Sequence, residues 1–483
     1  MASITIRGLD DDVEIRLRTR AAGERRSIAG EERQIPSEAV ACEAEPKNRA
    51  AFIRACIGPF GGVERELPLR TGRCARRRVS FPVKRQTVDL SIPAWSLHKT
   101  TMFQINPRLS GFTCLRTGTG LPVGDYHEGS PESAKEGFPA SLYATYRGEP
   151  CWPPARQDRG MARYGDFLPY LDFPSLGEGA TPLVPVPELA NGVGLEQAWV
   201  KNEGQNPTGS HKDRMSPLVV ARALATGQRT VAAASSGNAG VSLAAHAAAA
   251  GLNCAIVTVQ TVGSAWKRAL ETYGVELIVA ANTRERWDIL RQKSRSGSWY
   301  PATNYMVPPV GSNPYGVQGF KTVAYEIVED LGAEAPDCII VPTARGDLLW
   351  GILEGFRELN DLGQIGSIPR MYAVEPYPRI ARVLAGSDYR LGYPGTTRMS
   401  SIAGDTVSYQ AVHAVNRSGG DAVVVTDDEA AAAISHLAGQ GFYCESSSAA
   451  SLAALEALHR SGRLETIRTA VLILTSHGFK DTI

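Results

Sequence analysis

A lysine beside a turn is the first residue of this sequence whose setting suggests covalent chemistry. Lys212 lies in the segment Asn206-Pro-Thr-Gly-Ser-His-Lys-Asp-Arg214, and the stretch MSPLVVARALA that follows reads as a helix. A helix N-terminus disfavours a protonated amine, and an amine with a lowered pKa is what Schiff-base formation needs. The alternative is an ordinary solvated lysine, and this segment alone does not decide between them.

Two further segments place small or polar residues where a strand is expected to give way to a helix. Residues 235–238, Ser-Ser-Gly-Asn, follow the run TVAAA; the exposed amides of such a turn can cradle a carboxylate, and the Asn238 amide can bond a phenolic oxygen. Residues 343–347, Thr-Ala-Arg-Gly-Asp, follow CIIVP, and their amides, hydroxyl and guanidinium can bind a phosphate. The alternatives are a simple turn and a turn with a solvated Arg–Asp pair.

The fourth segment begins with Thr475 and Ser476, directly after the apolar run AVLIL near the C-terminus. A hydroxyl at the carboxyl end of a strand can meet a ring nitrogen, and the alternative is a cap of the last strand. All four segments stand at the end of an expected strand or the start of an expected helix. That is where α/β proteins place their ligands.

The elements that must position these segments alternate between apolar runs and helical stretches. Ala-rich helical stretches such as GVSLAAHAAAAG and DDEAAAAISHLAGQG separate the runs. The alternation from about residue 176 to the end predicts a doubly wound α/β architecture. The runs typical of buried parallel strands are TVAAAS, NCAIVTV, ELIVAA, CIIVPT, RMYAVE, AVVVT and TAVLILTS.

In this order the four segments resemble the threonine synthase family of fold-type II pyridoxal-phosphate enzymes, whose fold is tryptophan synthase β-like. The family motif Asn-Pro-Thr-Gly-Ser-Phe-Lys-Asp-Arg is matched except that His211 replaces Phe. The family motifs Gly-Glu-Gly-x-Thr-Pro-Leu, Ser-Thr-Gly-Asn and Thr-Gly-x-Gly-Leu-Lys-Asp correspond to residues 177–183, 235–238 and 475–481. The resemblance covers about residues 112–483 and includes Asn313-Pro314, Gly319-x-Lys321-Thr322 and Glu445-Ser-Ser-Ser-Ala-Ala450.

The resemblance implies two doubly wound parallel-sheet domains, pyridoxal 5′-phosphate as cofactor, and a homodimer. Lys212 would carry the cofactor and move the Cα proton, Asn238 would bond the 3′ oxygen, and Thr475 would meet the pyridine nitrogen. A neutral hydroxyl there leaves the ring unprotonated, which suits elimination and replacement; the protein supplies position and electrostatics. The residues implied to bind the cofactor are Lys212, Asn238, Thr343, Ala344, Arg345, Gly346, Asp347 and Thr475, and those implied to bind the substrate carboxylate are Ser235, Ser236 and Gly237.

Three departures from the family pattern affect these expectations. The family's phosphate loop is glycine-rich, whereas this one has Gly346 alone, and Arg345 either compensates with its charge or points to solvent. Gly316 stands where threonine synthases usually place an Arg that contacts the substrate's phosphate, and a phosphate without a cation is poorly held. Of the four thiolates of a zinc ribbon found in many relatives only Cys114 remains, so no metal site is expected.

The first hundred residues differ from the rest in charge and pattern. They carry 19 Lys and Arg against 13 Asp and Glu, whereas the remainder carries 32 against 37. Residues 1–41 weakly resemble the ribbon-helix-helix domains of bacterial antitoxins, but Gly30 and Pro36 interrupt the second helix. We interpret the chain as a degenerate segment (1–41), a disordered linker (42–101), a ribbon-like segment without zinc ligands (102–175) and the catalytic region (176–483), with a smaller subdomain inserted at about 215–325.

Composition limits the function classes. The 483 residues are 43% hydrophobic and 21% charged with a net charge of +1, which gives no general argument for a nucleic-acid or membrane partner. No long apolar run or secretory signal occurs, and the eight scattered Cys favour a reducing cytoplasm. We predict a cytoplasmic lyase that converts the small amino acid O-phosphohomoserine, with water, to threonine and phosphate. The alternatives are an ammonia-lyase or β-replacement enzyme on a small amino acid, and a DNA-binding regulator with an inactive cofactor domain.

Overall fold

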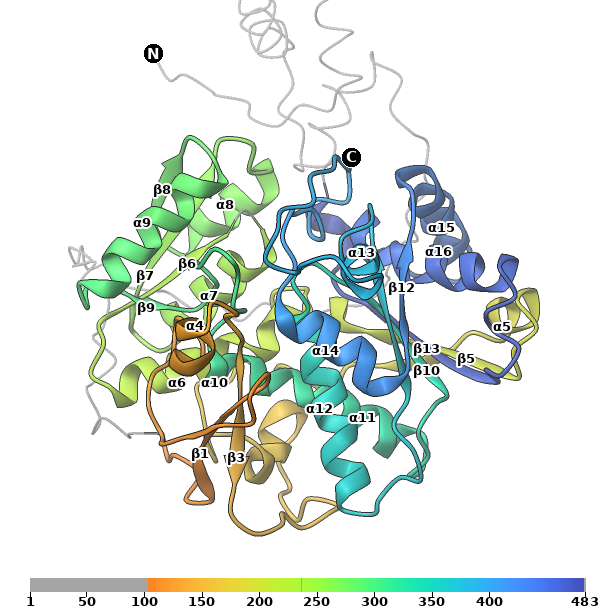
Figure 1. Cartoon of the computed structure of the whole chain (residues 1–483), viewed down its shortest axis with the longest axis horizontal. Coiled ribbons are helices and arrows are strands. Elements are labelled where there is room, and N and C mark those ends of the chain that lie inside the picture. The colour runs from red at the N-terminus through yellow and green to blue at the C-terminus, as the bar shows by residue number, and fades with distance from the viewer. Residues whose placement is uncertain (1–102, 236, 482–483) are drawn as a thin grey trace, which may run out of the picture. The chain divides into compact units, whose positions relative to one another are not determined.

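The computed structural model describes residues 103–235 and 237–481 (Figure 1). The predictions for residues 1–41 and 42–101, and that for Ser236, concern residues outside this range. The strands are β1 (Leu109–Cys114), β2 (Gly120–Leu121), β3 (Leu142–Tyr146), β4 (Leu183–Pro185), β5 (Gln197–Asn202), β6 (Thr230–Ala234), β7 (Asn253–Val259), β8 (Glu276–Ala280), β9 (Tyr300–Pro301), β10 (Cys338–Pro342), β11 (Arg370–Glu375), β12 (Asp421–Val424) and β13 (Thr469–Leu474).

The α-helices alternate with these strands over most of the chain. None of those in the described range is both long and apolar enough to span a bilayer. They are α4 (Pro131–Lys135), α5 (Pro187–Gly192), α6 (Ser216–Ala225), α7 (Asn238–Ala249), α8 (Ser264–Thr272), α9 (Thr283–Arg295), α10 (Pro314–Val317), α11 (Lys321–Asp330), α12 (Asp347–Asp361), α13 (Ile380–Leu384), α14 (Tyr409–Ser418), α15 (Asp427–Gly439) and α16 (Ser446–Arg460).

The larger sheet has the strand order β12-β11-β10-β13-β5-β4, and all its pairs are parallel except that between β4 and β5. Successive side chains of its central strands enter two different cores. Along β10, Ile339 and Val341 join one apolar cluster while Cys338 and Ile340 join another on the opposite face. Because both faces are buried under helices, the strands are apolar throughout rather than alternating, which is the pattern the sequence shows.

The smaller sheet has the order β8-β7-β6-β9 with every pair parallel, and lies on the left of Figure 1. Its strands also divide their side chains between two clusters, with Val231 and Ala233 of β6 on one face and Ala232 and Ala234 on the other. Two parallel sheets covered by helices confirm the predicted fold of two doubly wound units.

The seven predicted strands correspond to β6, β7, β8, β10, β11, β12 and β13. The sequence did not predict β5, although it lies between β13 and β4 in the larger sheet. Its sequence QAWVKN mixes charged and apolar residues, and Lys201 is nevertheless fully buried. The Lys201 ammonium is neutralised by a carboxylate from α11, a long-range contact that hydrophobic periodicity does not reveal.

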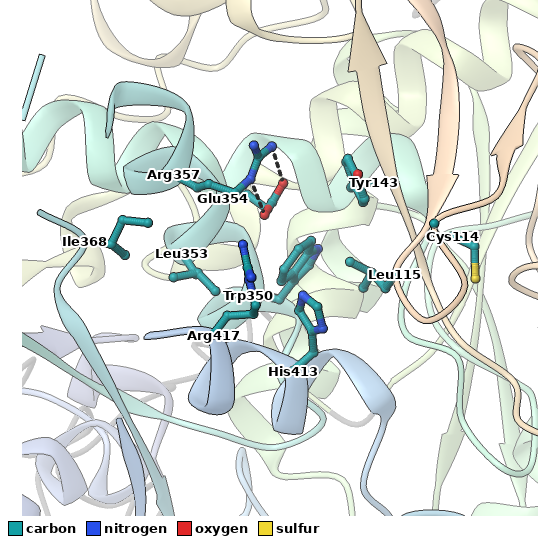
Figure 2. A pocket seen from close by; sticks show the side chains of 11 residues that line it. Cys114, Leu115, Tyr143, Trp350, Leu353, Glu354, Arg357, Ile368, His413 and Arg417 are labelled. Atoms are coloured by element: carbon teal, nitrogen blue, oxygen red, sulfur yellow. Dashed lines mark hydrogen bonds and ion pairs between the residues drawn. The ribbon is translucent and has the colours of Figure 1, made fainter. Parts of the chain in front are cut away.

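The segment before the two parallel sheets forms the antiparallel sheet β2-β1-β3, drawn in orange in Figure 1. Cys114 at the end of β1 lies 3.0 Å (Sγ to Oγ) from Ser133. Burial raises the pKa of this thiol, but hydrogen bonds with Ser130, Ser133 and Thr117 outweigh burial and lower it to about 7. The neighbours of the Cys114 thiol are thus hydroxyl groups rather than further thiols. Cys114 also lines a cavity between this sheet and helices α12 and α14 (Figure 2).

Candidate functional site

Three of the four predicted segments leave neighbouring strands at the same edge of the larger sheet. The strands β10, β13 and β5 are adjacent and parallel, so residues 343–347, 475–480 and 203–214 all begin at their carboxyl ends. The backbone N–H of His211 donates to the carbonyl of Thr475 at 2.9 Å, and the Ser476 hydroxyl donates to the carbonyl of Gly209 at 3.0 Å. The lysine segment and the C-terminal segment therefore form one continuous surface.

Lys212 lies in a short 3-10 helix, His211–Arg214, that precedes α6. Burial lowers the pKa of Lys212; the negative charge of Asp347 opposes this shift, and the positive charge of Arg345 adds to it. The predicted lowering of the pKa therefore has burial as its main cause rather than a helix dipole. The Lys212 ammonium also lies 5.5 Å from the centroid of the Phe320 ring.

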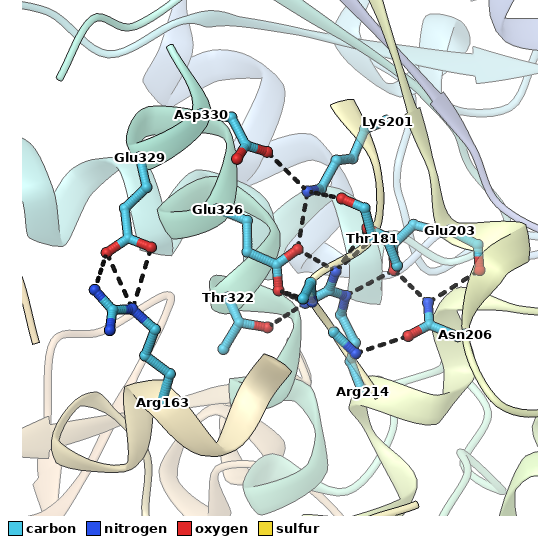
Figure 3. A network of polar contacts seen from close by, with 12 residues as sticks. Arg163, Thr181, Lys201, Glu203, Asn206, Arg214, Thr322, Glu326, Glu329 and Asp330 are labelled. Atoms are coloured by element: carbon cyan, nitrogen blue, oxygen red, sulfur yellow. Dashed lines mark hydrogen bonds and ion pairs between the residues drawn. The ribbon is translucent and has the colours of Figure 1, made fainter. Parts of the chain in front are cut away.

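A buried network of ion pairs and hydrogen bonds anchors the segment 203–214, which carries Lys212 (Figure 3). The fully buried Arg214 donates from Nε to Glu203 Oε2 at 2.6 Å and from Nη1 to Glu326 Oε1 at 2.7 Å. Lys201 lies 2.9 Å from the other oxygen of Glu326, and Arg214 also bonds Thr181. The network joins β5, α11 and the residues before β4 to the turn that carries Lys212, so it fixes where that amine lies.

Asn238, the first residue of α7, connects the smaller sheet to the C-terminal segment. Its Nδ2 donates to Glu445 Oε1 at 2.9 Å, and its Oδ1 accepts from Lys480 Nζ at 2.8 Å. The Glu445 carboxylate also accepts hydrogen bonds from Ser476 and Ser401, both at 2.8 Å. Burial raises the pKa of Glu445 against these hydrogen bonds, and burial lowers the pKa of Lys480.

The turn before α7 uses the Ser235 side chain to begin the helix. Ser235 Oγ accepts from the N–H of Gly240 at 3.0 Å and from that of Gly237 at 3.2 Å. The N–H groups of Asn238 and Ala239 belong to the first turn of α7, where a helix provides no intrahelical acceptor. These amides can donate to an anion, whereas the Ser235 hydroxyl oxygen already accepts hydrogen bonds within the turn.

The loop between β10 and α12 is shaped by one glycine. Gly346 has φ +90°, and a Cβ built on it would lie 2.5 Å from the Cβ of Ala411. Asp347 begins α12, and its carboxylate accepts from the hydroxyl of Ser312 at 2.7 Å and from Gln410 Nε2 at 2.8 Å. The backbone of this loop is therefore held against α14 in a conformation that presents the first turn of α12.

The other residues of this loop differ in what they offer a phosphate. Thr343 donates its hydroxyl to the carbonyl of Val341 at 2.7 Å and its N–H to Val374 at 2.8 Å, so both of its donors serve the protein. Ala344 is half-buried and has no polar side chain. The guanidinium of Arg345 lies over the Trp287 ring of α9, 5.2 Å from its centroid. Arg345 is half-buried against this ring, so its side chain does not extend freely into solvent.

Arg345 has other charged neighbours. Burial lowers the pKa of Arg345; Asp347 opposes the shift and Arg379 adds to it. Arg379 is fully buried and donates to the carbonyls of Gly404 at 2.6 Å and Thr343 at 3.0 Å. Arg345 and the start of α12 favour an anion at this end of the site, whereas Asp347 opposes one and Arg379 is already paired with Glu375 at 3.5 Å.

Thr475 ends β13 with its hydroxyl 2.9 Å from that of Ser448 in α16. Its carbonyl also accepts from the Nδ1 of His211 at 3.0 Å, in addition to the backbone hydrogen bond. Burial lowers the pKa of His211 well below its usual value, so the ring is neutral with its proton on Nδ1. The replacement of Phe by His at this position adds a hydrogen bond between the lysine turn and the C-terminal segment.

The partners that hold these residues are not evident in the sequence. Glu326 and Glu445 lie on or beside helices distant in the sequence, and no role was assigned to Lys480. One sequence signal was available for Glu326, because it is a charged residue in the apolar run Ala324-Tyr-Glu-Ile-Val328. A carboxylate in such a run needs a buried cation, and the structure supplies two, Arg214 and Lys201.

The residues present fit a phosphorylated aldehyde cofactor. They provide an amine with a lowered pKa, a helix N-terminus beside a guanidinium, an amide-bearing side chain and a neutral hydroxyl. A comparison with protein-family models matches residues 174–476 to the family described as pyridoxal-phosphate dependent enzyme. The chain belongs to the pyridoxal-phosphate-dependent enzyme family. Lys212, Asn238, Thr475 and the loop 343–347 all lie within the matched residues.

Within this pyridoxal-phosphate family the chain is similar to threonine synthases. It is 33% identical to the threonine synthase of Methanocaldococcus jannaschii over 338 residues, which cover 68% of this chain and 82% of the relative. It is 36% identical to that of Halalkalibacterium halodurans over 333 residues, 67% of this chain and 90% of the relative. The chain is therefore a threonine synthase-like pyridoxal-phosphate enzyme.

Solved structures of pyridoxal-phosphate enzymes share the fold. A pyridoxal 5′-phosphate-dependent aspartate racemase has a TM-score of 0.53 and 21% identity, covering 62% of this chain and 90% of its own. Maize serine racemase has a TM-score of 0.53 and 20% identity, covering 62% and 88%. A separate family model, antitoxin FitA-like ribbon-helix-helix, matches residues 2–40 and confirms the resemblance noted for the start of the sequence.

Proposed function

We propose that this protein is a lyase of the threonine synthase type, which converts O-phosphohomoserine and water to threonine and phosphate. The observation that carries the proposal is the position of Lys212. Its amine, with a pKa lowered by burial, lies at the sheet edge where the C-terminal segment and the start of α12 also lie. Threonine synthases are the relatives with 33% and 36% identity reported above.

Pyridoxal phosphate, when bound, supplies an electron-withdrawing ring that makes the substrate's Cα–H acidic. Lys212 would hold the cofactor, and its free amine would then take the proton from the substrate Cα. The lowered pKa serves this step because an unprotonated amine is required. The phosphate of the cofactor would lie at the start of α12, where Gly346 allows close approach of the backbone and Arg345 contributes charge.

The remaining residues would orient the reacting groups. The substrate carboxylate would lie against the turn Ser235–Gly237 and accept from the first amides of α7, and the Asn238 side chain would bond the cofactor's 3′ oxygen. Thr475 would meet the pyridine nitrogen with a hydroxyl that Ser448 already orients at 2.9 Å. A hydroxyl there leaves the ring less electron-withdrawing than a carboxylate would, which favours elimination and water addition over transamination.

One observation favours a second candidate function, an ammonia-lyase or β-replacement activity on a small amino acid. Gly316 lies in α10 against α6, and a Cβ built on it would lie 2.7 Å from both Met215 Cγ and Val219 Cγ2. The position is a packing contact without room for the Arg that threonine synthases usually have there. If a substrate phosphate binds, its cation must come from another position.

Product analysis separates the two candidates. The holoenzyme is incubated with O-phosphohomoserine, and in parallel with L-serine and L-threonine. Release of inorganic phosphate with stoichiometric threonine supports the first function, and release of ammonia with a 2-oxo acid supports the second. Lys212→Ala must abolish either reaction, and activity that survives in this variant contradicts both. The homodimer also stays a prediction, which sedimentation equilibrium of the holoenzyme measures.

A further inference from the structure

A serine of the segment Glu445–Ala450 contacts the hydroxyl that the proposed function assigns to the cofactor ring. Ser448 lies in the first turn of α16, and its Oγ is 2.9 Å from the Oγ1 of Thr475. Ser448 is fully buried and Thr475 is 4% exposed. The protein groups around this pair, rather than bulk water, therefore determine the direction of the hydrogen bond between the two hydroxyls.

The Ser448 hydroxyl has one hydrogen and two acceptors within reach. Its oxygen already accepts from the backbone N–H of Ser476 at 2.9 Å. Its hydrogen can be donated to Thr475 Oγ1 at 2.9 Å or to the carbonyl of Ser476 at 3.2 Å. Thr475 Oγ1 has no other donor among the described residues, whereas the Ser476 carbonyl also accepts from the backbone N–H of Glu445 at 3.3 Å. The shorter distance and the lack of another donor both favour donation to Thr475.

The direction of this bond determines what Thr475 offers to a ligand. If Ser448 donates to Thr475, the Thr475 hydrogen is free, and a ring nitrogen with a lone pair can accept it. If Ser448 instead donates to the Ser476 carbonyl, Thr475 donates to Ser448 and offers a ligand only a lone pair. A ring nitrogen would then have to carry a proton in order to bond Thr475. The two arrangements therefore predict opposite protonation states of the bound ring.

We infer that Ser448 donates to Thr475 and thereby keeps the ring nitrogen of bound pyridoxal phosphate unprotonated. Ser448 is then a positioning residue, because it acts on the cofactor through Thr475 and does not touch the reacting atoms. The inference rests on the proposed function, which places Thr475 at the ring nitrogen. It adds the residue that fixes the direction of that contact, and with it the electron-withdrawing strength of the ring.

Ser451 provides a matched control on the same helix. It is also fully buried, and its hydroxyl donates to the backbone carbonyl of Ser448 at 2.9 Å. Ser451→Ala therefore removes a buried serine hydroxyl of α16 but leaves the bond between Ser448 and Thr475. Ser448→Ala removes that bond. A difference between the two variants reports on the Thr475 hydroxyl and not on the general stability of the helix.

Nitrogen NMR of the holoenzyme measures the protonation directly. The protein is loaded with pyridoxal phosphate that carries ¹⁵N in the ring, and the chemical shift of this nitrogen is followed as the pH is changed. We expect an unprotonated nitrogen at neutral pH in the wild type. In Ser448→Ala the proton affinity of the nitrogen should rise about fivefold, because Thr475 can then turn a lone pair to a protonated ring. Ser451→Ala should match the wild type, and circular dichroism verifies that each variant is folded.

Three results would overturn the inference. A protonated nitrogen in the wild type at neutral pH shows that Ser448 donates to the Ser476 carbonyl, and this result needs no variant. Equal proton affinities in the wild type and Ser448→Ala show that Ser448 does not act on the ring. In a Thr475→Val background, Ser448→Ala should have no further effect, and a further effect shows that it does not act through Thr475.

The product analysis described above keeps the two proposals apart. A holoenzyme that forms threonine and phosphate with a protonated ring nitrogen retains the proposed function and contradicts the role of Ser448. A chain that binds no pyridoxal phosphate contradicts both. An unprotonated nitrogen in a holoenzyme that releases ammonia instead of phosphate supports the role of Ser448 and rejects O-phosphohomoserine as the substrate.

Discussion

Lys480 donates a hydrogen bond from Nζ to the Oδ1 of Asn238 at 2.8 Å, the shortest of the three hydrogen bonds that this oxygen accepts; Trp266 and Ser476 donate the other two at 3.3 and 3.4 Å. With Oδ1 directed to Lys480, Nδ2 is directed to Glu445 and keeps a second hydrogen for the cofactor oxygen. Lys480 therefore acts as a positioning residue for Asn238. The contact also joins the C-terminal segment to a helix of the other sheet.

The first prediction concerns this contact. Lys480→Met should remove the shortest and only charge-assisted hydrogen bond to the Asn238 oxygen among the described residues, shift the visible absorption of bound pyridoxal phosphate, and lower kcat/KM about tenfold. The spectrum and steady-state kinetics of the holoenzyme measure both effects. In an Asn238→Ala background, Lys480→Met should change neither quantity further. Additive effects in the double variant would show that Lys480 acts independently of Asn238.

The second prediction concerns the charge around Lys212. Asp347 raises its pKa and Arg345 lowers it, so Asp347→Asn should lower the pKa further and Arg345→Gln should raise it. The rate at which the apoprotein reacts with pyridoxal, which lacks the phosphate, follows the unprotonated fraction of this amine. Its midpoint on the pH axis should move down in the first variant and up in the second. A shift of both midpoints in the same direction would contradict this assignment of charges.

The third prediction concerns the buried network under the lysine turn. Burial raises the pKa of Glu326, but Arg214 and Lys201 outweigh it and lower it from 4.5 to about 2. A carboxyl group with a lowered pKa contributes its stability fully above pH 4.5 and loses it as the pH falls toward 2. Glu326→Gln should therefore lower the free energy of unfolding at pH 7 by about 3–5 kcal/mol, and this difference should shrink below pH 4.5.

Urea unfolding at several pH values measures this difference. Glu329→Gln on the same helix is the matched control, because Glu329 pairs with Arg163 at 3.0 Å in a partly exposed position. Glu329 also accepts from the Tyr164 hydroxyl at 2.6 Å, so this partly exposed group should contribute about 1 kcal/mol, still well below the loss expected for Glu326. Equal losses in the two variants, or a pH-independent loss in Glu326→Gln, would argue against the ionic role of Glu326.

The fourth prediction compares two glycines at opposite ends of α12. Gly346→Ala combines positive φ with a Cβ that meets Ala411, whereas Gly363→Ala has φ +66° and open space around its Cβ. We expect Gly363→Ala to cost about 1–2 kcal/mol of stability. Gly346→Ala should cost more and should also weaken pyridoxal phosphate binding. Urea unfolding measures the loss of stability, and titration with pyridoxal phosphate measures the loss of cofactor affinity. Unaltered cofactor affinity in Gly346→Ala would show that this loop does not bind the cofactor phosphate.

The fifth prediction concerns the part of the chain that resembles an antitoxin. A variant lacking residues 1–101 should keep kcat/KM within about twofold, because the residues assigned to the site all come later in the sequence. Loss of activity in a soluble truncated protein would contradict this. A mobility-shift assay of the full chain at low salt tests the alternative DNA-binding function, which predicts affinity that falls steeply with salt.

The fold and the chemistry-bearing segments were predictable from the sequence for a common reason. A strand buried on both faces is a short continuous apolar run, so β10 and β13 could be located, and the polar residues after them mark the site. The partners of these residues were not predictable, because Asn238 and Glu445 are 207 residues apart, and Arg214 and Glu326 are 112 apart. Such pairs meet only through the order of the strands. Strand β5 was not predictable for the same reason, because its buried Lys201 interrupts the apolar run and its ion-pair partner Glu326 is distant in the sequence.

The two sheets share the site unequally. Lys212, Thr475 and the start of α12 depend on strands of one sheet, whereas Asn238 and Trp287 belong to the unit built on the other. A hinge motion between the two sheets would break the Asn238–Lys480 hydrogen bond and the contact of Arg345 with the Trp287 ring. It would leave Lys212 and Thr475 in place relative to each other, because both are positioned by the larger sheet. If Lys212 holds the cofactor as proposed, such a motion would open the substrate side of the site while the cofactor stays attached.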